Sequence, residues 1–82
     1  MTPPYEGFNR TEFPIQFGRR LKALRNLRGM SQVVLAHRAG YAPQTISNLE
    51  RGLWPPTIPA MLVLAEVLDV HPKTLLFGDE EP

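Results

Sequence analysis

Apolar residues recur at intervals of three and four in the first third of the chain, after an irregular start. They are Phe17, Leu21, Leu24 and Leu27. This spacing places them on one face of a helix that we expect from about Pro14 to Arg28. Proline suits a first helical turn, and Gly29 suits the position after the last turn. Arg25 lies beside the apolar stripe, so it must reach solvent or find a carboxylate partner.

The next apolar pattern predicts two short helices joined by a tight turn. Ser31 is placed to cap the first of them, and Gly40 suits the left-handed residue that ends it. The second would begin near Ala42, carry Pro43 in its first turn and end at Glu50. The residues that we expect to face inward are Leu35, Ala36, Ala39, Ile46 and Leu49. Polar residues remain on the outward faces.

Two further helices are predicted after a loop that contains two prolines. Thr57 would cap the longer helix, which we expect to end near Asp69. Pro72 and His71 would start a short helix that ends before Gly78. The apolar residues of the two helices are Ile58, Met61, Leu62, Leu64, Ala65, Leu68, Leu75, Leu76 and Phe77. The whole pattern predicts five helices and no strand, and therefore an all-α fold.

The 82 residues suffice for one small domain, which we place at residues 15–78. Residues 1–14 contain three prolines and no sustained period, so we interpret them as an arm, mobile at its tip. Residues 79–82 would form an acidic tail. The chain has no cysteine, and no apolar run approaches the roughly 20 residues of a membrane span. We expect a cytoplasmic protein without a metal or other cofactor.

The net charge of +1 conceals an uneven distribution along the chain. Between Ile15 and Arg51, seven basic side chains and one acidic side chain give a local charge of +6. The basic residues are Arg19, Arg20, Lys22, Arg25, Arg28, Arg38 and Arg51. From Gly52 to Pro82, one basic and five acidic side chains give −4. A basic half favours a polyanion-binding surface, whereas merely solvated helix faces would carry mixed signs. On the first helix, we expect Arg19, Lys22 and Arg28 to face solvent or phosphate.

Many positions follow one known pattern in register. They are Phe17-Gly18, Leu21, Leu24-Arg25, Gly29-Met30-Ser31-Gln32, Leu35-Ala36, Ala39-Gly40, Thr45-Ile46-Ser47, Leu49-Glu50-Arg51-Gly52, Pro56-Thr57, Leu64-Ala65 and Leu68. In these positions the chain resembles the Cro and lambda-repressor-like family of helix-turn-helix proteins, also called the XRE family. The resemblance covers roughly residues 15–77. It implies a compact five-helix DNA-binding domain whose second and third helices form the helix-turn-helix.

The resemblance also implies roles for individual side chains. The expected base-reading residues are Pro43, Gln44, Ser47 and Asn48, and the expected phosphate contacts are Gln32, Thr45, Arg20 and Arg51. Gln44 is the best candidate for a bidentate contact to adenine. Pro43 stands where a long polar reader is common, which reduces the side chains available for direct readout. Arg25 and Glu50 occupy positions that pair as a largely buried ion pair in this family, so we expect them to be structural.

Some apolar residues depart from the family pattern. Val63 and Val67 add apolar surface to the fourth helix. Together with Leu76 and Phe77, they would belong to the dimer interface that the fourth and fifth helices form in relatives. Trp54 replaces a loop residue that is commonly basic or polar, and the sequence assigns it no role. Val33 and Val34 on the second helix also remain unassigned.

We therefore expect a sequence-specific regulator of transcription that binds double-stranded DNA as a homodimer. Its operator would be two-fold symmetric, with the third helix of each subunit in the major groove, and the protein would associate with the nucleoid. The alternative is a protein-interaction module, such as an antitoxin or adaptor, that binds a different protein through its last two helices. The two histidines, His37 and His71, form no recognisable nucleophile–base arrangement, so we do not expect an enzyme.

Overall fold

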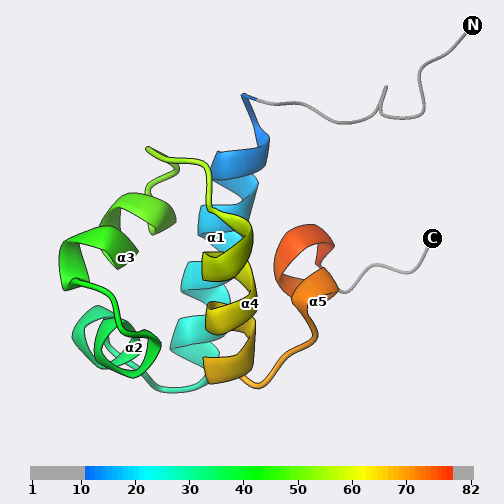
Figure 1. Cartoon of the computed structure of the whole chain (residues 1–82). Helices are drawn as coiled ribbons and strands as arrows, with labels where there is room; N and C mark the ends of the chain where they lie inside the picture. Colours follow the sequence, from blue (N-terminus) through cyan, green and yellow to red (C-terminus); the bar gives the residue numbers. More distant parts are fainter. Residues whose placement is uncertain (1–10, 79–82) are drawn as a thin grey trace, which may run out of the picture.

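Five helices follow one another along residues 11–78, the part of the chain that the computed structural model describes (Figure 1). They are α1 (Phe13–Leu27), α2 (Gln32–Ala39), α3 (Pro43–Glu50), α4 (Ile58–Val67) and α5 (Pro72–Phe77). No strand occurs within residues 11–78, and the expected all-α fold is confirmed. The first ten residues of the expected arm and the expected acidic tail at residues 79–82 lie outside the described residues.

The helix boundaries follow from local capping chemistry. The side chain of Ser31 accepts a hydrogen bond from the backbone N–H three residues further on (3.1 Å), and that of Thr57 does the same (3.2 Å). His71 accepts one through Nδ1 from the N–H two residues further on (3.0 Å). Gly40 ends α2 with a φ of +79°, and Asp69 adopts the left-handed conformation after α4 with a φ of +56°. Each of these residues had been expected to cap or end a helix.

One hydrophobic core draws residues from all five helices. Its buried members are Phe17, Leu21, Leu35, Ala36, Ile46, Leu49, Leu64, Ala65, Leu68 and Leu75. Helix α1 passes between α3 and α5, and α4 crosses in front of it in Figure 1. Gly18 allows α1 to pack directly on the end of α3, because a Cβ at this position would lie 2.6 Å from the carbonyl oxygen of Glu50. The core therefore holds α3 on one side of the domain and α5 on the other.

The ends of α1 differ from the prediction in two places. Phe13, which the sequence assigned to the arm, is the first residue of the helix and packs against the core, with its ring centroid 6.2 Å from that of Phe17. Leu27 is 73% exposed. A step of three residues falls about 60° short of a full helical turn, so successive steps of three carry Leu27 off the buried stripe. Among residues 11–78, no helix has the length and apolarity to cross a bilayer.

Candidate nucleic-acid interface

Helices α2 and α3 pack together and leave the beginning of α3 open to solvent. Gly40 turns the chain between them, and Ile46 and Leu49 bury one face of α3 in the core. Pro43 and Gln44, in the first turn of α3, are exposed. Helix α3 therefore has one face anchored in the domain and an exposed face that a partner can approach.

A buried ion pair anchors the other end of α3 to α1 and α2. Arg25 of α1 donates from Nε to Glu50 Oε2 (2.6 Å) and from Nη2 to Oε1 (3.1 Å). Gln32 of α2 donates from Nε2 to the same Oε1 (3.0 Å). Arg25 also donates from Nη1 to the carbonyl oxygen of Met30 (2.8 Å). The structure thus brings together the two charges that the resemblance paired, and it adds Gln32, which the sequence had assigned only to a phosphate.

The guanidinium of Arg25 is held in its charged form. The side chains of the ion pair are 9% exposed for Arg25 and 2% exposed for Glu50. The hydrogen bonds from Arg25 to Glu50 raise the pKa of Arg25 above its ordinary value, because they favour the charged guanidinium more than burial disfavours it. Stability from a base with a raised pKa is lost only as the pH rises through that pKa. The contribution is therefore fully present at neutral pH.

Gln44 is oriented by a residue one turn further along α3. Its Nε2 donates to Asn48 Oδ1 at 3.0 Å. Asn48 is only 7% exposed, and its backbone carbonyl accepts a hydrogen bond from the N–H of Leu53 (3.1 Å). Such burial leaves Asn48 little surface for contact with a base edge, and its role as a base reader stays a prediction. In the described structure its side chain accepts the hydrogen bond that orients Gln44.

The other predicted contacts of α3 lie on its accessible side to different degrees. Thr45 and Ser47 are half-buried, whereas Pro43 and Arg51 are exposed. Pro43 has no side-chain donor or acceptor, so the polar groups offered by this part of α3 come mainly from Gln44 and Ser47. This set is narrower than the one predicted from the sequence.

Arg20 of α1 and Arg28, which follows the last residue of α1, are bound to the ends of other helices. Arg20 donates from Nη1 to the carbonyl oxygen of Leu76 in α5 (2.7 Å). Arg28 donates to the carbonyl oxygens of Leu68 (2.7 Å) and Asp69 (3.2 Å), at the end of α4. A cation at the C-terminus of a helix also interacts favourably with the helix dipole. Arg20 therefore has a partner within the domain, and its phosphate contact stays a prediction. Arg28 is exposed, as expected, while its guanidinium also binds the end of α4.

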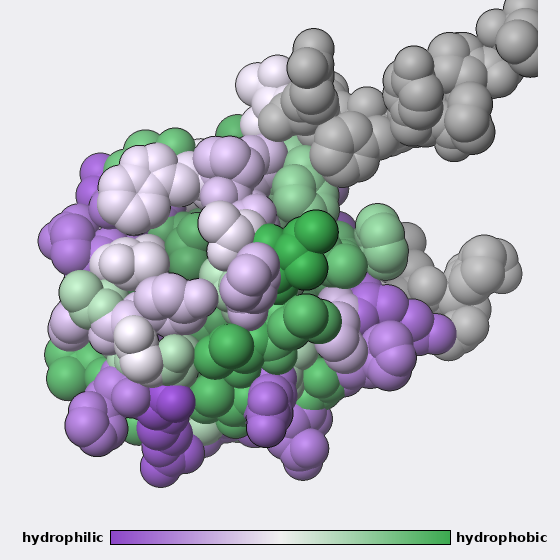
Figure 2. Space-filling view, in the orientation of Figure 1, coloured by the Kyte–Doolittle hydropathy of each residue, from purple (hydrophilic) through white to green (hydrophobic). Residues whose placement is uncertain are grey.

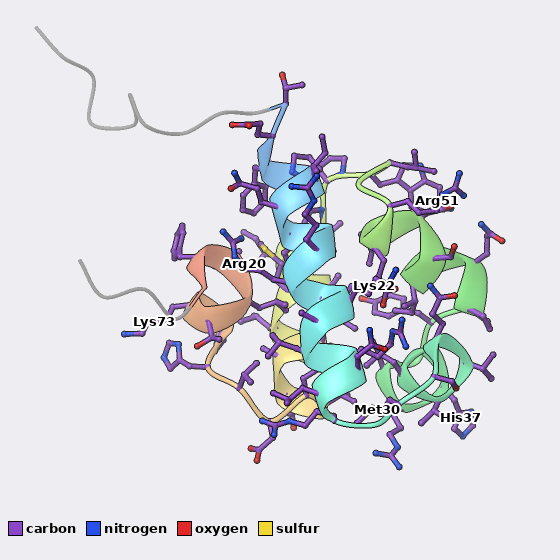
Figure 3. The ribbon with its side chains drawn as sticks, turned by 180° about the vertical axis from the view of Figure 1, so that it is seen from behind. Arg20, Lys22, Met30, His37, Arg51 and Lys73 are labelled. Carbon is purple, nitrogen blue, oxygen red and sulfur yellow. The ribbon has the colours of Figure 1, made fainter. Side chains whose placement is uncertain are left out.

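The other basic residues between Ile15 and Arg51 are also exposed, and they lie on α1, on α2 and at the end of α3. They are Arg19, Lys22, Arg38 and Arg51. Figure 3 shows Arg51 beside α3 and Arg20 beside α5, on opposite sides of α1. Hydrogen bonds to distant carbonyl oxygens have no sequence signal, because the partners of Arg20 and Arg28 lie 56 and 40 residues further along the chain. Sequence reasoning therefore could not separate the two groups of cations.

Apolar residues gather over α4 on the face of the domain shown in Figure 2. The residues assigned to a dimer interface are distributed between half-buried Val63, Val67 and Leu76 and exposed Phe77. Two residues that the sequence had counted only as helix residues are more exposed than the valines. Ile58 is 68% exposed and Leu62 is 52% exposed, values comparable with the 66% of Phe77. The most accessible apolar side chains of α4 are thus Ile58 and Leu62.

Comparison with known proteins places this arrangement in a family. The family of helix-turn-helix domains matches residues 16–76. The HTH-type transcriptional regulator y4dJ of Sinorhizobium fredii, itself uncharacterized, is 35% identical over 66 residues, which cover 79% of this chain and 86% of the relative. The family match at residues 16–76 therefore includes most of α1 and extends into α5.

Two solved structures have a similar fold. The restriction-modification controller protein C.AhdI from Aeromonas hydrophila is 35% identical with a TM-score of 0.74, and the match covers 76% of this chain and 94% of that one. The c2 repressor protein of P22, solved in complex with the synthetic operator 9T, is 32% identical with a TM-score of 0.72, with coverages of 77% and 96%. Both structures match over nearly their whole length.

Proposed function

The chain belongs to the Cro and lambda-repressor-like helix-turn-helix family of transcriptional regulators, and we propose that it recognises an operator in double-stranded DNA by placing α3 in the major groove. The relatives described above are an HTH-type transcriptional regulator, a restriction-modification controller protein and a repressor solved in complex with a synthetic operator. The chain is accordingly a DNA-binding domain and not an enzyme.

The observation that carries the proposal is the contrast between the two faces of α3. Its inner face is fixed by core residues and by the bonds from Arg25 and Gln32 to Glu50. Its first turn is exposed and carries Gln44, whose amide is already oriented by Asn48. A rigidly held helix with exposed polar side chains can present them to base edges with little loss of conformational entropy.

Base reading in this proposal depends mainly on Gln44. A glutamine amide can both donate to and accept from an adenine in the major groove. Ser47 would add a hydroxyl contact, and Pro43 would offer only apolar contact, for example to a thymine methyl group. Asn48 would act indirectly, by fixing the position of the Gln44 amide. We therefore expect few base pairs in each half-site to be read directly.

Phosphate contacts would surround this reading surface. One N–H of the Gln32 amide is bound to Glu50, and its second N–H can donate to a phosphate beside the first turn of α2. Thr45 and Arg51 remain proposed phosphate contacts. The exposed cations Arg19, Lys22 and Arg38 add positive charge to the same half of the chain. These contacts would give affinity and orientation without sequence preference.

A symmetric homodimer would place two copies of α3 in successive major grooves. The half-site centres would then be about 34 Å apart. The exposed apolar residues Ile58, Leu62 and Phe77 of α4 and α5 support a contact between copies, because burial of apolar surface drives such association. Val63, Val67 and Leu76 would support this surface from its half-buried edge.

The same apolar surface favours a second candidate function. A different protein could bind to Ile58, Leu62 and Phe77, as in an antitoxin or adaptor. That contact would be indifferent to Gln44→Ala and would produce a heteromeric complex. Sedimentation of the purified chain distinguishes the two candidates, because the homodimer forms without any added protein and is weakened by Leu62→Asp.

Salt dependence tests the proposed DNA binding. We expect the affinity of the chain for a random-sequence duplex pool to fall steeply as salt rises, because several phosphate contacts release counterions. The fluorescence anisotropy of a labelled pool, measured over a series of salt concentrations, gives this slope. The proposal fails if the folded chain binds no duplex even at low salt.

A further inference from the structure

We propose that Trp54, in the loop between α3 and α4, contacts the sugar-phosphate backbone beside the groove that α3 enters. This inference rests on the proposed function and adds a residue to which the family resemblance assigns no role. Trp54 is 50% exposed, although a tryptophan that served only to fill the core would be buried. It is the only tryptophan in the chain.

The backbone before Trp54 is fixed to the end of α3. The N–H groups of Gly52 and Leu53 each donate to a carbonyl oxygen in the last turn of α3, both at 3.1 Å. This pair of bonds closes a helix in a Schellman motif, and Gly52 supplies the positive φ of +72° that the motif requires. A Cβ on Gly52 would lie 2.9 Å from the Cα of Ile15, so the loop is also packed against the start of α1.

The backbone after Trp54 is constrained as well. Pro55 and Pro56 restrict their own φ angles and the conformations of the residues that precede them. Thr57 then caps α4 through its hydroxyl group at 3.2 Å. A loop that is held at both ends loses little backbone freedom when one of its side chains binds a partner. The backbone that carries Trp54 is therefore held in position before binding.

The surroundings of the loop favour a polyanion as the partner. The loop follows directly from α3 and lies at that end of the domain, away from α5 (Figures 1 and 3). Arg51 is exposed at its start, and the sequence contains no acidic residue between Arg51 and Glu66. Glu50, just before the loop, is buried and paired with Arg25. A phosphate approaching Trp54 would thus meet positive charge and no exposed carboxylate on this loop.

The chemistry of an indole suits the edge of the groove. Its ring can cover the apolar C–H face of a deoxyribose, and Nε1–H can donate to a phosphate oxygen. At least half of the hydrogen bonds between proteins and DNA go to phosphate and sugar. Trp54 precedes the exposed Ile58 of α4 by four residues, so contact with a second copy of the chain is the competing outcome that a measurement of self-association separates. We infer that Trp54 adds affinity without sequence preference.

The experiment uses the full chain and two duplexes of equal length, one enriched from a random pool and one with its sequence scrambled. Indole emission, excited where tyrosine does not absorb, reports on Trp54 alone, and anisotropy of labelled DNA gives the affinity. Trp54→Ala removes the indole, and Trp54→Phe keeps a ring but loses the N–H. Leu53→Ala is the matched control, because Leu53 is a neighbouring loop residue with a similar exposed fraction of 53%.

We expect the emission of the wild-type chain to change on binding and to saturate together with the anisotropy. Trp54→Ala should weaken binding to both duplexes by the same factor, about tenfold, and Trp54→Phe by about threefold. Leu53→Ala should change the affinity by less than about twofold. The slope of log affinity against log salt should be the same for Trp54→Ala and wild type, because no charge is removed.

Three results would overturn the inference while leaving the proposed function intact: unchanged emission in the saturated complex, equal affinity of Trp54→Ala and wild type, or a loss of self-association in Trp54→Ala. The last result would place Trp54 between two copies of the chain. If Trp54→Ala does not fold, the wild-type emission and Trp54→Phe still decide the question. Failure of the wild-type chain to bind either duplex would refute the proposed function and this inference together.

Discussion

Three arginines in and just after α1 have the same charge as the exposed cations Arg38 and Arg51 but different partners. Arg20 and Arg28 donate to carbonyl oxygens at the ends of α5 and α4, and Arg25 is paired with Glu50 in the core. Arg51 and Arg38 are exposed, as Arg28 is, but their side chains make no hydrogen bond within residues 11–78. The arginines of the first group donate to acceptors within the protein, whereas the cations of the second group are available to a partner.

The difference shows that a count of basic residues overstates a DNA-binding surface. The local charge of +6 between Ile15 and Arg51 pointed to a polyanion, but three of its seven basic side chains are used within the domain. Their bonds connect α1 to α3, α4 and α5, so they stabilise the scaffold that holds α3 in place. Substitutions in the two groups should therefore differ in their effects on stability and on DNA binding.

The largest effect is expected from breaking the buried ion pair. Arg25→Met should lower the free energy of unfolding by about 3–5 kcal/mol, because it leaves the Glu50 carboxylate buried without its counter-charge. Chemical denaturation monitored by circular dichroism measures this change. The matched control is the double variant Arg25→Met/Glu50→Leu, which removes both charges and should lose less stability than Arg25→Met alone. A double variant as unstable as the sum of the single variants would contradict a coupled pair.

Gln44→Ala should show the opposite behaviour, with little change in stability and a specific loss of binding. We expect about 1–3 kcal/mol of lost binding free energy at the selected operator and almost none on a scrambled duplex. Competition binding with the two duplexes measures the difference. Asn48→Ala provides a comparison, because it keeps the glutamine but removes the acceptor that orients it, and it should cause a smaller loss of specificity. Equal losses on both duplexes would refute base reading by Gln44.

Arg20→Ala should reduce stability and leave the electrostatics of DNA binding unchanged. Loss of its charged hydrogen bond to Leu76, which is partly exposed, should cost about 1–2 kcal/mol of unfolding free energy. The slope of log affinity against log salt should not change, because the guanidinium is assigned to α5 and not to a phosphate. Thermal unfolding and salt titration of the same preparation give both values. A shallower salt slope with unchanged stability would restore the phosphate role expected from the sequence.

Arg51→Ala should produce the smallest effect and the reverse signature. We expect affinity to fall about fivefold on every duplex and the salt slope to decrease by about one, with stability unchanged. Arg51→Lys keeps the charge and serves as the control that preserves the slope. An effect confined to the selected operator would instead make Arg51 a base-reading residue.

The fold was largely predictable because the local signals agree. Apolar spacing, the caps at Ser31 and Thr57, and Gly40 all indicate the same helices, and the structure contains them. One detail depended on tertiary packing and had no local signal: Phe13 joins α1 and packs against the core. The exposure of Leu27, by contrast, follows from the helical period, which carries it off the buried stripe.

The candidate site was predictable only in part. The approach of Arg25 to Glu50 was implied by the family pattern, but the bond from Gln32 to the same carboxylate and the burial of Asn48 were not. Where the apolar pattern places asparagine and glutamine on the outward face of a helix, the sequence is equally polar whether they contact DNA or a neighbouring side chain. Only the packing of α3 against the loop that follows it separates Gln44 from Asn48.

In vitro selection of bound duplexes from a random pool, carried out in parallel with wild type and Gln44→Ala, tests the central claim most directly. We predict that the wild type enriches a two-fold symmetric site with half-site centres about 34 Å apart. Gln44→Ala should enrich a site that differs by relaxed preference at one position in each half-site. Enrichment of no sequence by the folded wild-type chain, or identical sites for both proteins, would contradict recognition of an operator through α3.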